Sequence, residues 1–213
     1  MRLCGRYEKS AAVSDRDLVF TVPRDDVEID FVALSAAVPK ATVHKRIFID
    51  FLLVEIADRV PPEQVLARAQ VELTAGDPFD DVAWHDYFAV LLTVAELLAG
   101  PERPAAAGLR EIGRSTYRRL LELPVGRLLL GRQLSDALRV AGELWEEFNS
   151  IGRVRAEARG ERAYDYHFDP YPAALTETIG VGVFEGMFRY HHMAGDIGLA
   201  RLGPTQTIMR LTW

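Results

Sequence analysis

The chain has 213 residues, of which 49% are apolar and 26% are charged, so it can form one sizeable hydrophobic core. Its net charge of −6, without any basic run, argues against nucleic acid as a partner, because phosphate attraction supplies most of that affinity. The single cysteine, Cys4, excludes intrachain disulfides and cysteine-based zinc sites, and no apolar run approaches the ~18 residues of a membrane span, so we expect a soluble cytoplasmic protein.

Residues 1–29 form a lead segment that is polar at first and then contains a short β-prone run, DLVFTV. A second β-prone or mixed run, VEIDFVAL, follows the turn-like PRDD and extends into the next region. The lead segment could be an added strand pair, a swapped arm or a tether. We treat residues 30–213 as a single domain.

Helical periodicity dominates residues 43–148. The clearest case begins at Trp84, where Phe88 and Leu91 follow at i+4 and i+7 and Gly100-Pro101 ends the pattern. The same reasoning predicts helices over about 43–59, 61–73, 84–98, 105–123 and 124–148. The N-terminal two-thirds is therefore expected to be rich in helices.

The side-chain period then changes from 3.6 to 2, which predicts a hairpin with strands at about 152–159 and 162–168. With Gly160-Glu161 as the turn, Arg155 lies opposite Tyr166, and Glu157 lies opposite Tyr164. That register puts the arginines and aromatic residues on one face, and on the other face it puts Val154, Ala156, Ala158, Ala163, Asp165 and His167.

A proline-initiated segment, PYPAALTETIGVGVFEGMFRYHHMAG, predicts a helix that crosses between strands, and two more strands follow it in IGLARL and TQTIMRLTW. Its glycines, Gly180, Gly182 and Gly186, would let this helix approach the small-residue face of the sheet closely. The predicted fold class is α+β, a helix-rich region followed by a four-stranded antiparallel sheet with a crossing helix and with helices on one side.

Three stretches carry a resemblance to a known family: VALSAAVPKATVHKRIFIDFLL, REIGRSTYRRLLELPVGRLLL and VGVFEGMFRYHHMAG. Together with the final strand ending in Trp213, they resemble a paralogous family of uncharacterised myxobacterial domains over about residues 30–213. That family is similar to the group of haem-nitric-oxide sensor domains, 4-vinyl-reductase-type binding domains and TRAPP-type tethering subunits. The resemblance implies a ligand-binding sensor or an interaction subunit rather than one reaction.

Aromatic side chains on the helices exceed what packing against a sheet needs, which favours a ligand pocket between the helices and the sheet. The expected lining consists of Phe48, Phe51, Trp84, Phe88, Tyr117 and Trp145. A non-enzymatic regulatory module that binds a small apolar or amphipathic ligand, or a partner protein, is the leading hypothesis. A homodimeric scaffolding subunit is the first alternative.

An enzyme is the second alternative, with Asp165 and His167 at i,i+2 on one strand as an acid/base pair. Arg114 and Arg118 share a helix face and form a candidate anion site, although nearby acids favour ordinary surface ion pairs.

Adjacent His191 and His192 point about 100° apart on a helix, so we expect a helix-end role and no metal. No cofactor is expected. Haem remains an alternative through one histidine among His44, His85, His167 and His192, but the chain lacks the Tyr-x-Ser-x-Arg clamp of the haem sensors.

Overall fold

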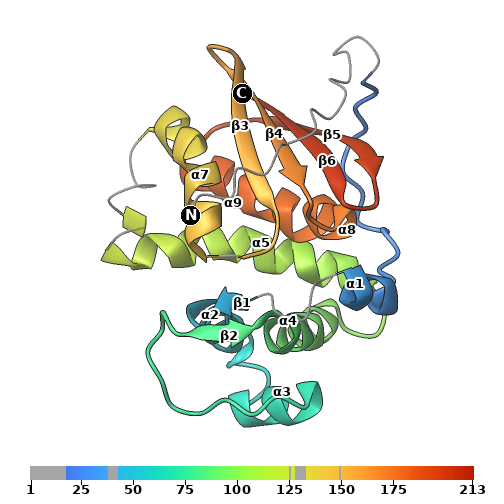
Figure 1. Ribbon diagram of the computed structural model, residues 1–213, viewed down its shortest axis with the longest axis vertical. Helices are drawn as coiled ribbons and strands as arrows, with labels where there is room; N and C mark the ends of the chain where they lie inside the picture. The colour runs from blue at the N-terminus through green and yellow to red at the C-terminus, as the bar shows by residue number, and fades with distance from the viewer. Residues whose placement is uncertain (1–17, 38–42, 125, 128–132, 149) are drawn as a thin grey trace, which may run out of the picture.

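The computed structural model describes residues 18–37, 43–124, 126–127, 133–148 and 150–213 (Figure 1). Within these ranges the helices are α1 (Phe31–Ala37), α2 (Ile47–Ile56), α3 (Pro62–Ala69), α4 (Trp84–Ala99), α5 (Ala105–Glu122), α7 (Leu134–Phe148), α8 (Ala173–Leu175) and α9 (Val181–Tyr190). The strands are β1 (Val43–Lys45), β2 (Asp81–Ala83), β3 (Arg153–Gly160), β4 (Ala163–Asp169), β5 (Asp196–Gly203) and β6 (Gln206–Thr212). None of the described helices combines the length and apolarity needed to cross a bilayer.

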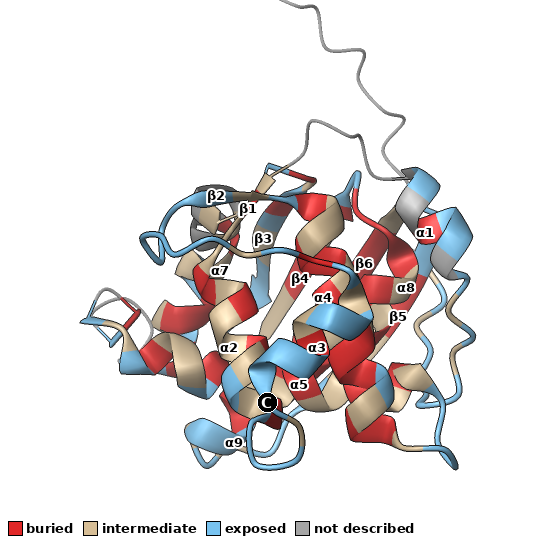
Figure 2. Ribbon diagram, turned by 90° about the horizontal axis from the view of Figure 1, so that it is seen from below, coloured by how far each residue is buried: buried red, intermediate tan, exposed pale blue. Residues whose placement is uncertain are grey.

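The predicted α+β class is confirmed. The main sheet has four antiparallel strands in the order β3-β4-β6-β5, and the crossing segment between β4 and β5 contains α8, a π-helical turn η2 (Thr176–Gly180) and α9. Helices α5, α7 and α9 lie on one side of this sheet (Figure 1). Buried residues concentrate where helices and sheet meet (Figure 2), because each inner face is apolar and excludes water there.

The predicted hairpin register is wrong by one residue. Arg155 pairs with His167 and Glu157 with Asp165, because the turn consists of residues 161–162 and the ladder shifts between Ala158 and Gly160. Side chains alternate between the two faces of a strand. A register shift of one residue therefore pairs each face of β3 with the face of β4 opposite to the one predicted. The inner face therefore carries Val154, Ala156, Tyr164, Tyr166 and Phe168, and the outer face carries Arg155, Glu157, Asp165 and His167.

The sequence predicted that residues 43–148 are almost wholly helical, but this region also contains two short strands. Residues 43–45 form strand β1, which pairs antiparallel with β2 at residues 81–83. The Arg46 amide donates to the Asp80 carbonyl at 3.0 Å, so helix α2 begins only at Ile47. This two-stranded ribbon fixes His44 at the base of the helical region, where the sequence pattern had suggested one more helical turn.

Two of the three glycines of the crossing segment, Gly182 and Gly186, do not face the sheet, contrary to the prediction, whereas a Cβ on Gly180 would lie 3.7 Å from Met209 Cε on β6. A Cβ on Gly182 would lie 2.2 Å from the Arg110 carbonyl oxygen, and one on Gly186 would lie 2.4 Å from that of Arg114, so both glycines face α5. Close approach to the sheet comes instead from α7, where a Cβ on Gly142 would lie 2.6 Å from the Val154 carbonyl oxygen. The glycines thus set the α5–α9 and α7–β3 spacings.

The described part of the lead segment contacts the free edge of β5. Thr21 and Leu199 exchange two backbone hydrogen bonds of 2.9 Å, and Phe20 lies against Gly198. Residues 31–37, which the sequence left as β-prone or mixed, form α1, with an Asp30 carboxylate accepting the Ala33 amide at 2.9 Å. Residues 1–17 lie outside the described part of the chain.

Candidate functional site

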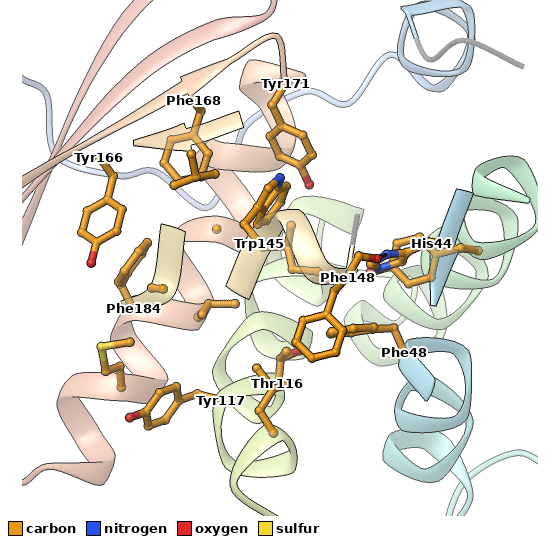
Figure 3. Close-up of a pocket in the computed structure, with 18 of the residues that line it drawn as sticks. His44, Phe48, Thr116, Tyr117, Trp145, Phe148, Tyr166, Phe168, Tyr171 and Phe184 are labelled. Atoms are coloured by element: carbon orange, nitrogen blue, oxygen red, sulfur yellow. Dashed lines mark hydrogen bonds between the residues drawn. The ribbon is translucent and has the colours of Figure 1, made fainter. Parts of the chain in front are cut away.

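A cavity of about 140 Å³ lies between the helices and the inner face of the sheet. Figure 3 shows His44 and Phe48 on one side of it and Tyr166 and Phe184 on the other. Residues from both parts of the fold line it: His44, Phe48, Trp84, Tyr87, Thr116, Tyr117, Leu120, Ala141, Trp145, Phe148, Val154, Tyr166, Phe168, Tyr171, Ile179, Gly180, Val183, Phe184 and Met187.

The cavity walls are mainly aromatic rings that pack on one another. Trp145 meets Tyr171 edge-on with ring centroids 4.8 Å apart, and Tyr166 meets Phe184 at 4.7 Å. Such ring pairs are stable in edge and tilted arrangements, and they hold the walls apart without filling the space between them. The site is therefore a preformed apolar space of the kind that receives small molecules.

His44 supplies one polar edge of the cavity. It is 3% exposed, and its Nδ1 lies 2.7 Å from the Phe148 backbone oxygen, which can only accept, so Nδ1 carries the proton. Burial lowers the pKa of His44 to about 4. The ring is therefore a neutral imidazole at physiological pH, and its Nε2 carries a lone pair that can accept a hydrogen bond.

Trp84 also lines the cavity, through its ring. The side chain is 1% exposed, and its Nε1 is buried without a hydrogen-bond partner in the described structure. An indole N–H is a donor only, and leaving one unpaired in the interior costs about 1–3 kcal/mol. Its ring centroid lies 5.4 Å from that of His44. The unpaired donor has almost no accessible surface, so it lies within the packed wall and does not open into the cavity.

Three other polar groups of the lining have hydrogen-bond partners. The Tyr117 hydroxyl and His191 Nε2 are 2.9 Å apart, and burial raises the pKa of Tyr117, so the phenol stays protonated. The Thr116 hydroxyl donates to the Ile112 carbonyl at 2.9 Å, and Trp145 Nε1 donates to the Ile151 carbonyl at 3.1 Å. These hydrogen bonds fix the orientation of the three side chains in the cavity wall.

The structure brings together four of the six pocket residues predicted from the sequence: Phe48, Trp84, Tyr117 and Trp145. Phe88 lies in the surrounding core, and Phe51 lines a much smaller hollow between α2 and α5. The sequence reasoning missed His44 and the aromatic residues of β4. The alternation in AYDYHFD could have identified the latter, since every second residue of a half-buried strand faces the core.

Haem can be tested against this cavity. Of the four candidate histidines only His44 lines it, and its Nδ1–H bond to a backbone carbonyl is the arrangement that metal-binding histidines adopt. The volume, however, is close to the ~150 Å³ of an engineered cavity that holds one benzene, and a porphyrin contains four pyrrole rings. Among the described lining residues there is also no lysine or arginine to pair with propionates. The cavity in this conformation does not fit haem.

Asp165 and His167 lie on the outer face of the sheet, away from the cavity. Asp165 is fully buried and accepts hydrogen bonds from Arg159 Nε at 2.8 Å and from Arg210 Nε and Nη2 at 2.8 and 2.7 Å. Burial alone would raise the pKa of Asp165, but the bonds from Arg210 and Arg159 outweigh it and lower the pKa. A carboxylate held ionised by two guanidiniums is a poor general base.

His167 lies beside the same cluster. Its Nε2 is 3.4 Å from a Glu157 carboxylate oxygen, a contact that lacks hydrogen-bond geometry, since the same nitrogen has no hydrogen-bond partner in the described structure. Burial, followed by the positive charge of Arg155, lowers the pKa of His167. The predicted acid/base pair therefore shares a face but forms part of a charged cluster.

The candidate anion site is occupied by protein. Arg114 Nε lies 2.7 Å from the Glu185 carboxylate, which also binds Arg110 through two nitrogens. Bonds from both arginines outweigh burial and lower the pKa of Glu185. Arg118 is exposed on α5. The geometry is that of a surface ion-pair network linking α5 to α9.

The two adjacent histidines separate at the end of α9. His191 is half-buried against Tyr117, whereas His192 is exposed with φ 54° in the left-handed region that ends helices. In the part of the chain that the structure describes, no group of three or more His, Cys, Asp or Glu residues is placed to hold a metal ion. The helix ends between the two histidines, so their imidazoles lie in different surroundings and do not form a shared site.

In fold, the chain is similar to solved H-NOX structures. One, described as modulating haem redox potential through protein-induced porphyrin distortion, gives a TM-score of 0.62 and 14% identity over 79% of this chain and 99% of that one. A mutant structure of T. tengcongensis H-NOX gives 0.61 and 15% over 79% and 96%. An oxygen-binding H-NOX domain related to soluble guanylate cyclases gives 0.61 and 15% over 78% and 90%. The resemblance to haem-nitric-oxide sensor domains is thus confirmed as a shared fold.

A comparison with curated proteins finds no match. One family model, described as "Protein of unknown function (DUF2378)", matches residues 79–213. The matched stretch runs from just before β2 to the end of β6, and so includes Trp84, the sheet and the crossing helix, but not His44. Because the match spans more than half of the sequence, the chain belongs to this family of uncharacterised domains.

Proposed function

We propose that the chain is a non-enzymatic regulatory module that binds a small apolar or amphipathic molecule in the cavity between its helices and its sheet. The observation that carries this proposal is the aromatic cavity itself. Protein interiors pack densely and rarely keep voids larger than a water molecule. A space of about 140 Å³ with mainly aromatic walls departs from that dense packing. Such a space suits a small apolar ligand.

The position of the cavity suits regulation. His44 and Phe48 belong to the β1–α2 region, whereas Val154, Tyr166 and Phe184 belong to the sheet and its crossing helix. A ligand that contacts both sides favours the conformations in which they are close, and so shifts the population between states. The fold shared with an oxygen-binding H-NOX domain supports a ligand-binding role.

Native and denaturing mass spectrometry of the freshly purified full chain, with a visible absorption spectrum of the same sample, tests the proposal. We expect a small mass that is present in the native spectrum and lost on denaturation, without a Soret band. A Soret band would identify haem and show that the cavity opens much further. An apo mass at the weight of a dimer, with no small molecule binding on titration, would favour the interaction-subunit alternative instead.

A further inference from the structure

We infer that Ser150, an exposed residue outside the cavity lining, is a positioning residue that holds His44 and Phe148 in place as walls of the cavity. The inference concerns the same cavity and so rests on the proposed function. It follows from hydrogen bonds that join strand β1 to the end of helix α7, where Ser150 contacts Val43 across a separation of 107 residues in the sequence.

Among the described residues, four hydrogen bonds join these two segments, and we call them the β1–α7 clasp. The Ser150 amide donates to the Val43 carbonyl at 3.2 Å. The Ser150 hydroxyl donates to the same carbonyl at 3.2 Å and accepts from the Val43 amide at 2.8 Å. The fourth bond joins His44 Nδ1 to the Phe148 carbonyl at 2.7 Å. Ser150 therefore makes most of the clasp, chiefly through its hydroxyl.

Neither wall residue is fixed by its own element alone. Strand β1 has three residues and pairs only with β2, and short two-stranded ribbons are marginally stable. Phe148 is the last residue of α7, so its carbonyl has no donor within the helix. His44 directly follows Val43 in the chain, and Phe148 precedes Ser150 by two residues. The bonds between Val43 and Ser150 therefore bring the His44 ring to this carbonyl.

Ser150 lies on a segment that is fixed on its other side. Trp145 Nε1 donates to the Ile151 carbonyl at 3.1 Å, and Ile151 is buried. Gly152 has a φ of 71°, and a Cβ there would lie 2.8 Å from the Pro170 carbonyl oxygen, so the chain packs closely against the end of β4. The clasp therefore ties β1 to the part of the molecule that contains the sheet.

The clasp adjoins the ligand space, and Figure 3 shows His44, Phe48 and Phe148 close together. His44 stacks on Phe48 with ring centroids 4.6 Å apart, and Phe48 meets Phe148 edge-on at 5.3 Å. All three rings line the cavity. Without the Ser150 hydroxyl, the Val43 amide would bond to water, and the positions of these rings would no longer be fixed. Because Ser150 is exposed, its loss should leave the fold intact.

Proton NMR of the ligand-free full chain tests the clasp through His44. A buried imidazole N–H in a hydrogen bond exchanges slowly with water and gives its own resonance, which His44→Phe would assign by removing it. We expect Ser150→Ala to raise the rate of this exchange about 10-fold, whereas Ser150→Thr, which keeps the hydroxyl, should leave it unchanged. An unchanged exchange rate in Ser150→Ala would overturn the inference.

Calorimetric titration with toluene, a small apolar probe, measures the effect on the cavity. We expect Ser150→Ala to bind toluene about 3- to 10-fold more weakly than the wild type, and Ser150→Thr to bind it equally. Ser115→Ala is the matched control, because the Ser115 hydroxyl lies outside the cavity lining and donates to the Ile112 carbonyl of its own helix at 2.9 Å.

Unchanged toluene affinity in Ser150→Ala, with folding confirmed by circular dichroism, would overturn the positioning role and leave the proposed function standing. A wild type that does not bind toluene would instead count against the proposed function. The His44 resonance, which is measured without ligand, would still support or overturn the clasp in that case.

Discussion

The two faces of strand β4 have opposite chemistry. Toward the helices, Tyr166 and Phe168 line an aromatic cavity. Toward the outside, Asp165 accepts three bonds from two arginines, and the Phe20 ring lies 4.2 Å from the Arg210 guanidinium. The inner face has unfilled space, whereas the outer face is held by paired charges. Binding is therefore expected on the inner face, and the charged outer face serves to hold the sheet together.

Removing the central carboxylate of the outer face is expected to have the largest effect. Asp165→Ala leaves Arg159 and Arg210 facing each other without this counter-charge. Breaking a buried ion pair costs about 3–5 kcal/mol, and because both arginines are about a third exposed we expect about 3–4 kcal/mol of lost unfolding free energy, measured by urea denaturation. Asp165→Asn should lose somewhat less. A loss under about 1 kcal/mol would refute the stabilising role of this face.

Acid should weaken the inner face through His44. The pKa of this buried imidazole is lowered from 6.5 to about 4, so the unfolded chain binds the proton more readily than the folded chain between these pH values. The contribution of His44 to the free energy of unfolding is complete above pH 6.5. It falls by about 3 kcal/mol in total as the pH is lowered toward 4. Urea denaturation of the wild type and His44→Phe at about pH 7 and about pH 4.5 should show the extra acid sensitivity in the wild type alone. An equal loss of unfolding free energy between the two pH values in both proteins would mean that the His44 imidazole is exposed to water in the folded chain.

The wall formed by α9 depends on its contact with α5, on the side away from the sheet. Gly182→Ala would place a methyl group 2.2 Å from the Arg110 carbonyl oxygen, which forces the helices apart and should cost about 2 kcal/mol. Gly180→Ala is the matched control, because its nearest neighbour would be 3.6 Å away and the change removes backbone freedom from the unfolded chain. Thermal unfolding should therefore separate two substitutions only two residues apart. Similar melting temperatures would mean that α5 and α9 adjust freely.

Filling the cavity should have the smallest effect on stability and the opposite sign. Ala141 lies on α7 at the cavity wall, and Ala141→Leu would place three more carbons in the empty space. We expect about 1 kcal/mol of added stability in urea denaturation and loss of ligand binding in calorimetry. Val140→Leu on the same helix, outside the cavity lining, serves as the comparison variant. Retained ligand affinity in Ala141→Leu would place the binding site elsewhere.

Much of this arrangement could be predicted from sequence, but not the contents of each face. The helix from Trp84, the hairpin, the crossing helix and the final strands were expected from periodicity, as were the cavity residues Phe48 and Trp145. The register failed because a bulge adds one residue that no composition rule reveals, and the faces were exchanged with it. His44 was missed as a lining residue because a three-residue strand is too short to show a period. The first outcome came from backbone geometry beside a hairpin turn and the second from pairing between distant segments, and neither is visible in a local pattern.

The π-helical turn at 176–180 makes the length of the crossing segment intolerant of change. An extra residue in one helical turn offsets every later side chain by about 100° relative to a regular helix. Deleting one residue there would regularise the helix but rotate Val183, Phe184 and Met187 off the cavity wall, and Gly182 away from α5. Relatives that share this cavity should therefore accept substitutions in the segment far more readily than a single insertion or deletion.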